Sequence, residues 1–360
     1  MSLETCKASI IHLGERSYQI LAGDGLLKRL GEALREYLPD VTGCILVTSP
    51  SVDGLYGSRA TAALETLHPG KVLIPEGEEA KTWEAVGELL GSMIRHGLDR
   101  RAVIVALGGG SVGDSAGFAA SIYMRGTRIA QVPTTLLGQV DSGVGGKTAI
   151  NHSAGKNLVG SFHQPSLVVC DTGLLATLPK RELRSGLAEV VKYGVISDVV
   201  LYEGVEAETE KLLSADVDTL RWIVTRCVAA KARYVEADER DDRGVRSALN
   251  YGHTVGHAVE TLSGHSLRHG EAVAIGMIAA ARIAFSLGLL KRADLERQIS
   301  LLKVLGLPIE VPYEIDEVIP LLRRDKKAER GSIRFVLPTG IGYEPVARIV
   351  SEAELRGVLT

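Results

Sequence analysis

The sequence is poor in cysteine and has no excess of charge of either sign. Its 360 residues include four cysteines, Cys6, Cys44, Cys170 and Cys227. They lie tens of residues apart, which excludes the close cysteine pairs of a zinc ribbon or a redox motif, and we expect reduced thiols in the core. The 41 Lys and Arg against 44 Asp and Glu leave a formal net charge of -3. Without a basic excess, nucleic acid is not expected as a partner.

Long apolar runs are missing as well. The longest in the C-terminal half, Ala272 to Ala281, is far shorter than the ~20 residues of a membrane-spanning helix. The first residues, MSLETCKASI, do not resemble a signal peptide. We therefore expect a cytoplasmic protein without a membrane segment. Glycine, in contrast, is abundant, and its 40 residues indicate many tight backbone turns.

Two kinds of pattern follow one another along the chain. Up to about residue 175, amphipathic segments alternate with short β-branched runs at 44–48, 71–75, 102–110, 129–135 and 167–171. Beyond Thr177 helical periodicity takes over at 186–194, 219–235, 252–262 and 271–288, and only 332–338 looks extended. The first pattern is typical of βαβ units. We therefore predict an α/β protein, with a Rossmann-like nucleotide-binding domain over 1–176 and a mostly α-helical domain over 177–360.

A glycine-rich segment follows the strand predicted at 102–107. Gly108, Gly110 and Gly113 have the G-x-G-x-x-G spacing and open a predicted helix. Glycine lets backbone amides approach a pyrophosphate, which the start of a helix also attracts. The motif comes after some hundred residues and is followed by QVPTT rather than by the usual acid. A dinucleotide in a non-standard arrangement is one interpretation, and a mere tight turn is the other.

Histidines gather in one part of the chain, between Asn250 and Gly276. His253 and His257 lie four residues apart, on one face of a predicted helix, and His269 begins the next apolar helix. Glu189 interrupts an otherwise apolar helical face and offers a carboxylate. Two imidazoles and one carboxylate are typical of a catalytic zinc site. The alternative is that each histidine is an ordinary polar residue.

Charged residues near glycines are the remaining candidates. Most lysines and arginines are only solvated, but Lys147 and Lys156 are flanked by glycines that permit close approach to an anion. A small substrate with two anionic groups would suit them. The acidic segment at 76–81, by itself, indicates only a charged helix start.

Taken together and in order, these motifs resemble those of the 3-dehydroquinate synthase family. The matching segments are GGGSVGDSAGF, YMRG, QVPTTLLGQVDSGVGGKTAIN, GKNLVGSFHQP, GLAEVVKYG, DERDDRGVRSALNYGHTVGHAVE, HGEAVAIGM and DKKAERGSIRFVLP. They cover essentially the whole chain. The resemblance implies NAD, one divalent metal (zinc, or cobalt in its place), and a homodimer that acts on a small sugar-phosphate acid in the shikimate route.

The resemblance also implies roles for individual residues. The metal ligands would be Glu189, His253 and His269. The NAD-binding residues would be Glu76, Gly77, Glu78, Lys81, Gly109, Gly110, Ser111, Val112, Gly113, Asp114, Thr134, Thr135, Lys147, Lys156, Leu174, Leu175, Ala176 and Thr177. The substrate-binding residues would be Arg125, Lys147, Lys156, Asn157, Lys192, Lys231, Arg246, Asn250, His257, Lys326 and Lys327. The catalytic residues would be Asp141, Lys147, Lys192, Asn250 and His257.

The roles implied for Arg125 and for the pair Lys326 and Lys327 involve a second subunit in the first case and an open choice in the second. Arg125 would reach the site of the partner subunit. Only one lysine of the pair Lys326 and Lys327 would close over the substrate phosphate, and the sequence does not distinguish them.

One loop departs from the family pattern. Relatives commonly carry an acid after the strand at 44–48 that binds the adenosine ribose, but this chain has Ser49, Pro50 and Ser51. We expect a weaker ribose contact, or one supplied by Asp53. The loop also has no Arg or Lys for a 2'-phosphate, so NAD is expected rather than NADP.

The resemblance implies a lyase that converts 3-deoxy-D-arabino-heptulosonate 7-phosphate to 3-dehydroquinate and phosphate. Three alternatives remain from the sequence. They are a related cyclase acting on sedoheptulose 7-phosphate, a metal-dependent polyol dehydrogenase, and a non-catalytic NAD-binding regulator.

Overall fold

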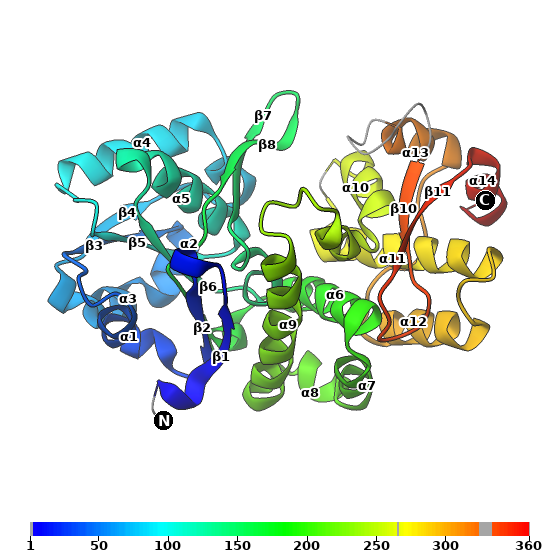
Figure 1. The fold of residues 1–360 in the computed structure, drawn as a ribbon, viewed down its shortest axis with the longest axis horizontal. Helices are drawn as coiled ribbons and strands as arrows, with labels where there is room; N and C mark the ends of the chain where they lie inside the picture. The colour runs from blue at the N-terminus through cyan, green and yellow to red at the C-terminus, as the bar shows by residue number, and fades with distance from the viewer. Residues whose placement is uncertain (1–2, 265, 324–332, 360) are drawn as a thin grey trace. The chain divides into compact units, whose positions relative to one another are not determined.

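The computed structural model describes residues 3–264, 266–323 and 333–359 (Figure 1). None of the helices in these ranges is long and apolar enough to cross a membrane. The chain forms two compact units. Unit 1 consists of Met1–Leu178 with Leu220–Arg240, and unit 2 of Pro179–Thr219 with Asp241–Thr360.

Unit 1 is built on a seven-stranded sheet in the order β1-β2-β9-β6-β5-β3-β4. All neighbouring strands are parallel except β1 and β2, which pair antiparallel. The strands are β1 (Lys7–Ile11), β2 (Tyr18–Gly23), β3 (Cys44–Thr48), β4 (Gly70–Leu73), β5 (Val103–Gly108), β6 (Arg128–Pro133) and β9 (Leu167–Asp171). The predicted α/β class is confirmed, and β1 and β2 are strands that the sequence patterns did not predict.

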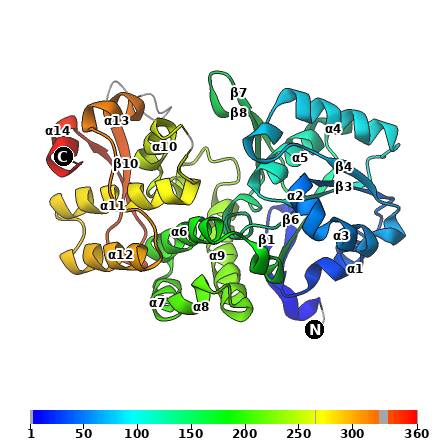
Figure 2. The same ribbon diagram turned by 180° about the vertical axis from the view of Figure 1, so that it is seen from behind.

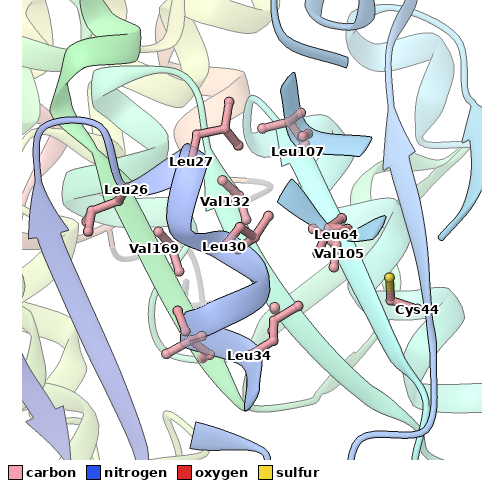
Figure 3. Packing of buried hydrophobic residues seen from close by; sticks show 14 of the residues in the cluster. Leu26, Leu27, Leu30, Leu34, Cys44, Leu64, Val105, Leu107, Val132 and Val169 are labelled. Atoms are coloured by element: carbon pink, nitrogen blue, oxygen red, sulfur yellow. The ribbon is translucent and has the colours of Figure 1, made fainter. Parts of the chain in front are cut away.

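Helices cover both faces of this sheet, as a parallel sheet requires. They are α1 (Leu30–Tyr37), α2 (Pro50–Val52), α3 (Ser58–Ala63), α4 (Trp83–Arg95) and α5 (Gly110–Ile122). Helices α1 and α3 pack on one face and α4 and α5 on the other (Figures 1 and 2). Leu30 and Leu34 of α1 belong to one buried hydrophobic cluster with Val105 and Val132 of the sheet (Figure 3). All four cysteines are buried and free, as predicted.

A separate hairpin, β7 (Lys147–His152) with β8 (Gly155–Phe162), completes the strands of unit 1. It projects from the unit in both views (Figures 1 and 2). The sequence patterns did not predict these two strands. The hairpin carries three of the residues that the family resemblance assigns to cofactor and substrate.

Unit 2 is mostly helical, as predicted. Its helices are α6 (Lys180–Ser197), α7 (Val199–Ala207), α8 (Thr209–Leu213), α10 (His253–Leu262), α11 (His269–Ser286), α12 (Arg292–Val304), α13 (Ile315–Leu322) and α14 (Glu352–Leu359). Two antiparallel strands accompany them, β10 (Ile333–Leu337) and β11 (Val346–Val350). The expectation of a single extended segment in this region was wrong, because β10 pairs with β11.

Helix α9 (Val217–Ala237) differs in its placement from the predicted domain ranges. Most of it belongs to unit 1, although the prediction assigned all of 177–360 to one domain. Glu236 accepts a hydrogen bond from the amide of His12, and Glu239, just beyond the helix, pairs with Arg16. These contacts hold α9 to the N-terminal strands.

Candidate functional site

Three potential metal ligands converge in unit 2. Glu189 lies in the middle of α6, His253 is the first residue of α10, and His269 is the first residue of α11. One ligand atom from each lies within 4.8 Å of the others. His253 Nε2 is 3.7 Å and His269 Nε2 is 3.5 Å from Glu189 Oε1. The structure therefore brings together the predicted ligand set.

The other ring nitrogen of each ligand histidine is held by a neighbour. His253 Nδ1 donates to the carbonyl oxygen of Tyr251 at 3.1 Å. His269 Nδ1 donates to Glu260 Oε2 at 3.3 Å. Hydrogen bonds of this kind fix the tautomer, so that Nε2 of each histidine is directed at Glu189. Glu260 was not among the predicted site residues, and its position three residues after His257 is the only feature of the sequence that points to it.

The two histidines differ in their electrostatics. Burial, followed by the ammonium of Lys192, lowers the pKa of His253 to about 3, so its ring is neutral. Burial also opposes protonation of His269, but hydrogen bonds and attraction from Glu189 and Glu260 outweigh it and raise the pKa to about 10. A proton on His269 thus supplies positive charge where a metal ion would supply it.

Close helix packing places these side chains. A Cβ on Gly276 of α11 would lie 1.8 Å from the carbonyl oxygen of Gly252, and one on Gly270 would lie 1.9 Å from that of Ser185. Only glycine permits backbones to approach this closely. The Gly270 amide also donates to Ser185 Oγ at 3.0 Å, which fixes the start of α11 against α6.

Other predicted residues of unit 2 lie near this cluster in the chain. Lys192 is almost fully buried and its Nζ contacts Glu189 Oε2. The exposed ring of His257 has its centroid 5.2 Å from that of His253 and is not one of the three converging ligands. Arg246, which is buried, and Asn250 lie in a 3-10 helix, Val245–Asn250. Lys326 and Lys327 lie outside the described residues.

The glycine-rich segment of unit 1 forms the predicted strand-turn-helix. Strand β5 ends at Gly108, Gly109 is the N-cap of α5, and the helix begins at Gly110. A Cβ on Gly109 would lie 3.3 Å from Thr135 Cγ2, and one on Gly113 would lie 2.7 Å from Gln131 Oε1. The predicted phosphate-binding turn and the Thr134–Thr135 segment therefore lie side by side.

The acidic segment 76–81 is tied to this turn and to the hairpin. The buried Lys81 Nζ lies 2.5 Å from Asp114 Oδ2 and also contacts Asn157 Oδ1. Burial raises the pKa of Asp114, and the ammonium of Lys81 opposes that rise. Asn151 was not among the predicted site residues. Its side-chain Nδ2 donates to Glu78 Oε2 at 2.6 Å, and its backbone N–H donates to the Lys81 carbonyl oxygen at 2.9 Å.

The remaining predicted residues of unit 1 lie on several elements. Lys231 Nζ, on α9, donates to the carboxylate oxygen Oδ1 of Asp141 at 2.7 Å and to the backbone carbonyl oxygen of Asp141 at 2.6 Å. Tyr56 donates to the Leu174 carbonyl at 2.8 Å and so fixes the 3-10 helix that contains Leu174 to Thr177. Arg125 is exposed and has a left-handed backbone with φ of 66°.

Comparisons with known proteins agree with this arrangement. Residues 71–185 match the family described as 3-dehydroquinate synthase N-terminal, and residues 186–328 match 3-dehydroquinate synthase C-terminal. The 3-dehydroquinate synthase of Pelobacter propionicus is 49% identical over 350 residues, covering 95% of this chain and 96% of its own.

Two solved structures are also similar. ValA (2-epi-5-epi-valiolone synthase) from Streptomyces hygroscopicus, with NAD+ and Zn2+ bound, is 31% identical with a TM-score of 0.87, covering 97% of each chain. A 2-deoxy-scyllo-inosose synthase, complexed with carbaglucose-6-phosphate, NAD+ and Co2+, is 29% identical with a TM-score of 0.88, covering 98% of each chain.

Fold and site together place the chain among the sugar-phosphate cyclases. Within that group the chain belongs to the 3-dehydroquinate synthase family, whose members are lyases. The resemblance noted in the sequence is thereby confirmed.

Proposed function

We propose that this chain converts 3-deoxy-D-arabino-heptulosonate 7-phosphate to 3-dehydroquinate and phosphate, with NAD and a divalent metal, Zn2+ or Co2+, as cofactors. The observation that carries the proposal is the cluster of Glu189, His253 and His269 in a chain that matches the family along nearly its whole length. The reaction would supply the route to chorismate and the aromatic amino acids.

The residues of unit 2 fit a catalytic divalent metal. Two imidazole nitrogens and one carboxylate form the donor set that zinc and cobalt accept, and three protein ligands leave a position for substrate oxygens. Tyr251 and Glu260 hold the Nδ1 atoms, which leaves both Nε2 atoms for the metal. His253 is neutral near pH 7, as a ligand must be.

Bound metal would polarise substrate oxygens, and bound NAD would take up one hydride and return it. The chain's own residues would hold the substrate and place its protons. Lys192 would lie beside the metal ligand Glu189, Asn250 would lie near the anionic groups of the substrate, and the exposed His257 would face the substrate. Lys231 would hold the Asp141 carboxylate ready for the reacting hydroxyls.

In unit 1, the turn at Gly109 to Asp114 would receive the pyrophosphate of NAD. Its amides and the start of α5 suit an anion. The pair of Lys81 and Asp114 and the contact of Lys81 with Asn157 would fix the rim of this site. The segments Glu76 to Lys81, Thr134–Thr135 and Leu174–Thr177 would complete it.

The substrate carries a carboxylate and a phosphate, and we assign them to the cations of the chain. Lys147 and Lys156 of the hairpin would stand beside the cofactor and the substrate. Lys231 and Arg246 would bind the carboxylate, and Lys326 or Lys327 the phosphate. Arg125 would serve the site of a second subunit in a homodimer, and its left-handed backbone supports a positioned role.

The experiment that tests the proposal measures phosphate and NADH together. Purified protein with the heptulosonate phosphate, NAD and zinc should release phosphate without net NADH, because both hydride transfers use the same bound cofactor. Steady accumulation of NADH would favour a polyol dehydrogenase, and the absence of any turnover would favour a regulator.

A cyclase acting on sedoheptulose 7-phosphate is the second candidate, and the substrate carboxylate distinguishes the two. A site built around a polar group rejects analogues lacking it by about 10⁴ to 10⁵. Sedoheptulose 7-phosphate should therefore be a very poor substrate, and Arg246→Ala should narrow the gap between the two sugars. Equal wild-type efficiency on both sugars would overturn the proposal.

A further inference from the structure

The missing acid after β3 leaves one part of the NAD site without an assigned residue. Strand β3 neighbours β5, whose end carries the glycine-rich turn, and in dinucleotide folds the acid on the neighbouring strand end binds the ribose diol. Here that position holds Ser49, Pro50 and Ser51. An acid from another part of the chain must therefore reach the end of β3 if the ribose diol is bound in the usual way.

Asp53, the alternative considered from the sequence, is engaged elsewhere. Its two carboxylate oxygens lie 2.9 and 3.1 Å from Lys71 Nζ, on β4. This pair directs the carboxylate of Asp53 to the strand β4. It also neutralises Lys71, the cation that β4 offers in this region.

Glu76 reaches the end of β3 from the loop that follows β4. Strands β3 and β4 are parallel neighbours with Thr48 opposite Leu73, so both loops leave the same edge of the sheet. The amide of Ser51 donates to Glu76 Oε1 at 2.7 Å. Hydrogen bonds from Ser51 and from the Ser49 side chain lower the pKa of Glu76 against the opposing effect of burial, so the group is a carboxylate near pH 7.

We infer that Glu76, held at the end of β3 by Ser51, is the acid that binds the adenosine ribose diol of NAD and discriminates against NADP. The inference rests on the proposed use of NAD. One oxygen of the carboxylate is used by Ser51, and the other has lone pairs for the ribose hydroxyls. A 2'-phosphate in the same place would meet a negative charge with no basic residue in the 49–51 loop to offset it.

The other acids of the same loop serve as comparison. Glu78 accepts a hydrogen bond from Asn151, which directs its carboxylate toward the hairpin. Glu79 is exposed and follows on the same short 3-10 helix, Gly77–Ala80. Glu79→Ala is therefore a matched control that removes one charge from the loop but leaves the end of β3 unchanged.

The test measures the dissociation constants of NAD+ and NADP+ for the full chain by isothermal titration calorimetry. Wild type should prefer NAD+. Because a hydrogen bond to a charged group is worth about 10 to 100-fold in binding, Glu76→Ala should weaken NAD+ by about 10-fold or more. Binding of NADP+ should not weaken, so the ratio of the NADP+ dissociation constant to the NAD+ dissociation constant should fall. Glu76→Gln should lose the discrimination as well, since it removes the charge, and Glu79→Ala should keep the wild-type ratio.

An unchanged ratio in Glu76→Ala or Glu76→Gln would overturn the inference while leaving the proposed function intact. If the ratio fell as much in Glu79→Ala as in Glu76→Ala, the inference would also be overturned. That result would mean that the total charge of the loop, and not the position of Glu76, sets the preference for NAD+. Failure of the wild-type chain to bind NAD+ at all would instead overturn the proposed function. A melting temperature measured for each variant identifies any loss of fold.

Discussion

His269 Nδ1 lies 3.3 Å from Glu260 Oε2. The pair joins the last turn of α10 to the first residue of α11. Because Nδ1 donates to Glu260, Nε2 is the ring atom left to face Glu189, 3.5 Å away. Glu260 is therefore a positioning residue for a metal ligand.

Removing Glu260 should weaken metal binding without removing a ligand. Loss of such a partner costs about 10 to 100-fold in metal affinity, so Glu260→Ala should raise the dissociation constant of Zn2+ by this factor. Glu260→Gln, which keeps an acceptor oxygen, should lose less. Competition with a chelator measures the affinity, and Glu296→Ala, on the exposed face of α12, serves as control. A wild-type affinity in Glu260→Ala would refute the positioning role.

Removing Glu189 should affect both the metal and the fold. Its buried carboxylate contacts the ammonium of Lys192, which is also buried. Breaking a buried ion pair at one partner costs about 3 to 5 kcal/mol, so Glu189→Ala should lower the free energy of unfolding by this amount and lose the metal. The double variant Glu189→Ala, Lys192→Met should regain stability but not metal. Full metal content in either variant would exclude Glu189 as a ligand.

The protonation states of His253 and His269 determine how many protons are released when a metal ion binds. With a pKa of about 3, His253 has no proton to release near pH 7, whereas His269, with a pKa of about 10, carries one. Metal must displace that proton, so affinity should rise about tenfold per pH unit up to about pH 10. Calorimetry of the metal-free chain in buffers of different ionisation enthalpy should give about one proton per metal. A count of zero would contradict this charge assignment.

Much of the fold was predictable because buried parallel strands have continuous apolar sequences. The runs at 44–48 and 167–171 match β3 and β9. The hairpin of β7 and β8 was not predicted, because β8 has no fully buried residue and so lacks an apolar run. Strand β11 was also missed, although four of its five residues are apolar.

The site was predictable where its residues interrupt an apolar pattern, as Glu189 does in α6. Glu260 was not, because a single glutamate on an amphipathic helix has the same pattern as a solvated face. The placement of α9 depends on contacts between distant positions, such as Lys231 with Asp141. Helical periodicity carries no information about such partners. The prediction therefore placed α9 in the same domain as the helices that precede and follow it in the chain.

Glycines allow α10 and α11 to pack closely together. A Cβ at position 276 would lie 1.8 Å from the carbonyl oxygen of Gly252, directly before His253. Backbone cannot rotate away as a side chain can, so Gly276→Ala should cost at least the ~1 to 3 kcal/mol typical of overpacking. Because the helices must separate, it should also weaken the metal site at His253 and His269.

The matched control for Gly276→Ala is Gly87→Ala, in the exposed middle of α4, where an added Cβ would meet no atom within 4 Å. There alanine should stabilise the helix by up to ~1 kcal/mol, since glycine is the poorer helix former. Denaturant unfolding of both variants, with metal affinity measured in parallel, separates the two effects. If Gly276→Ala proved as stable as wild type and bound metal equally well, close helix packing would not be what positions these ligands.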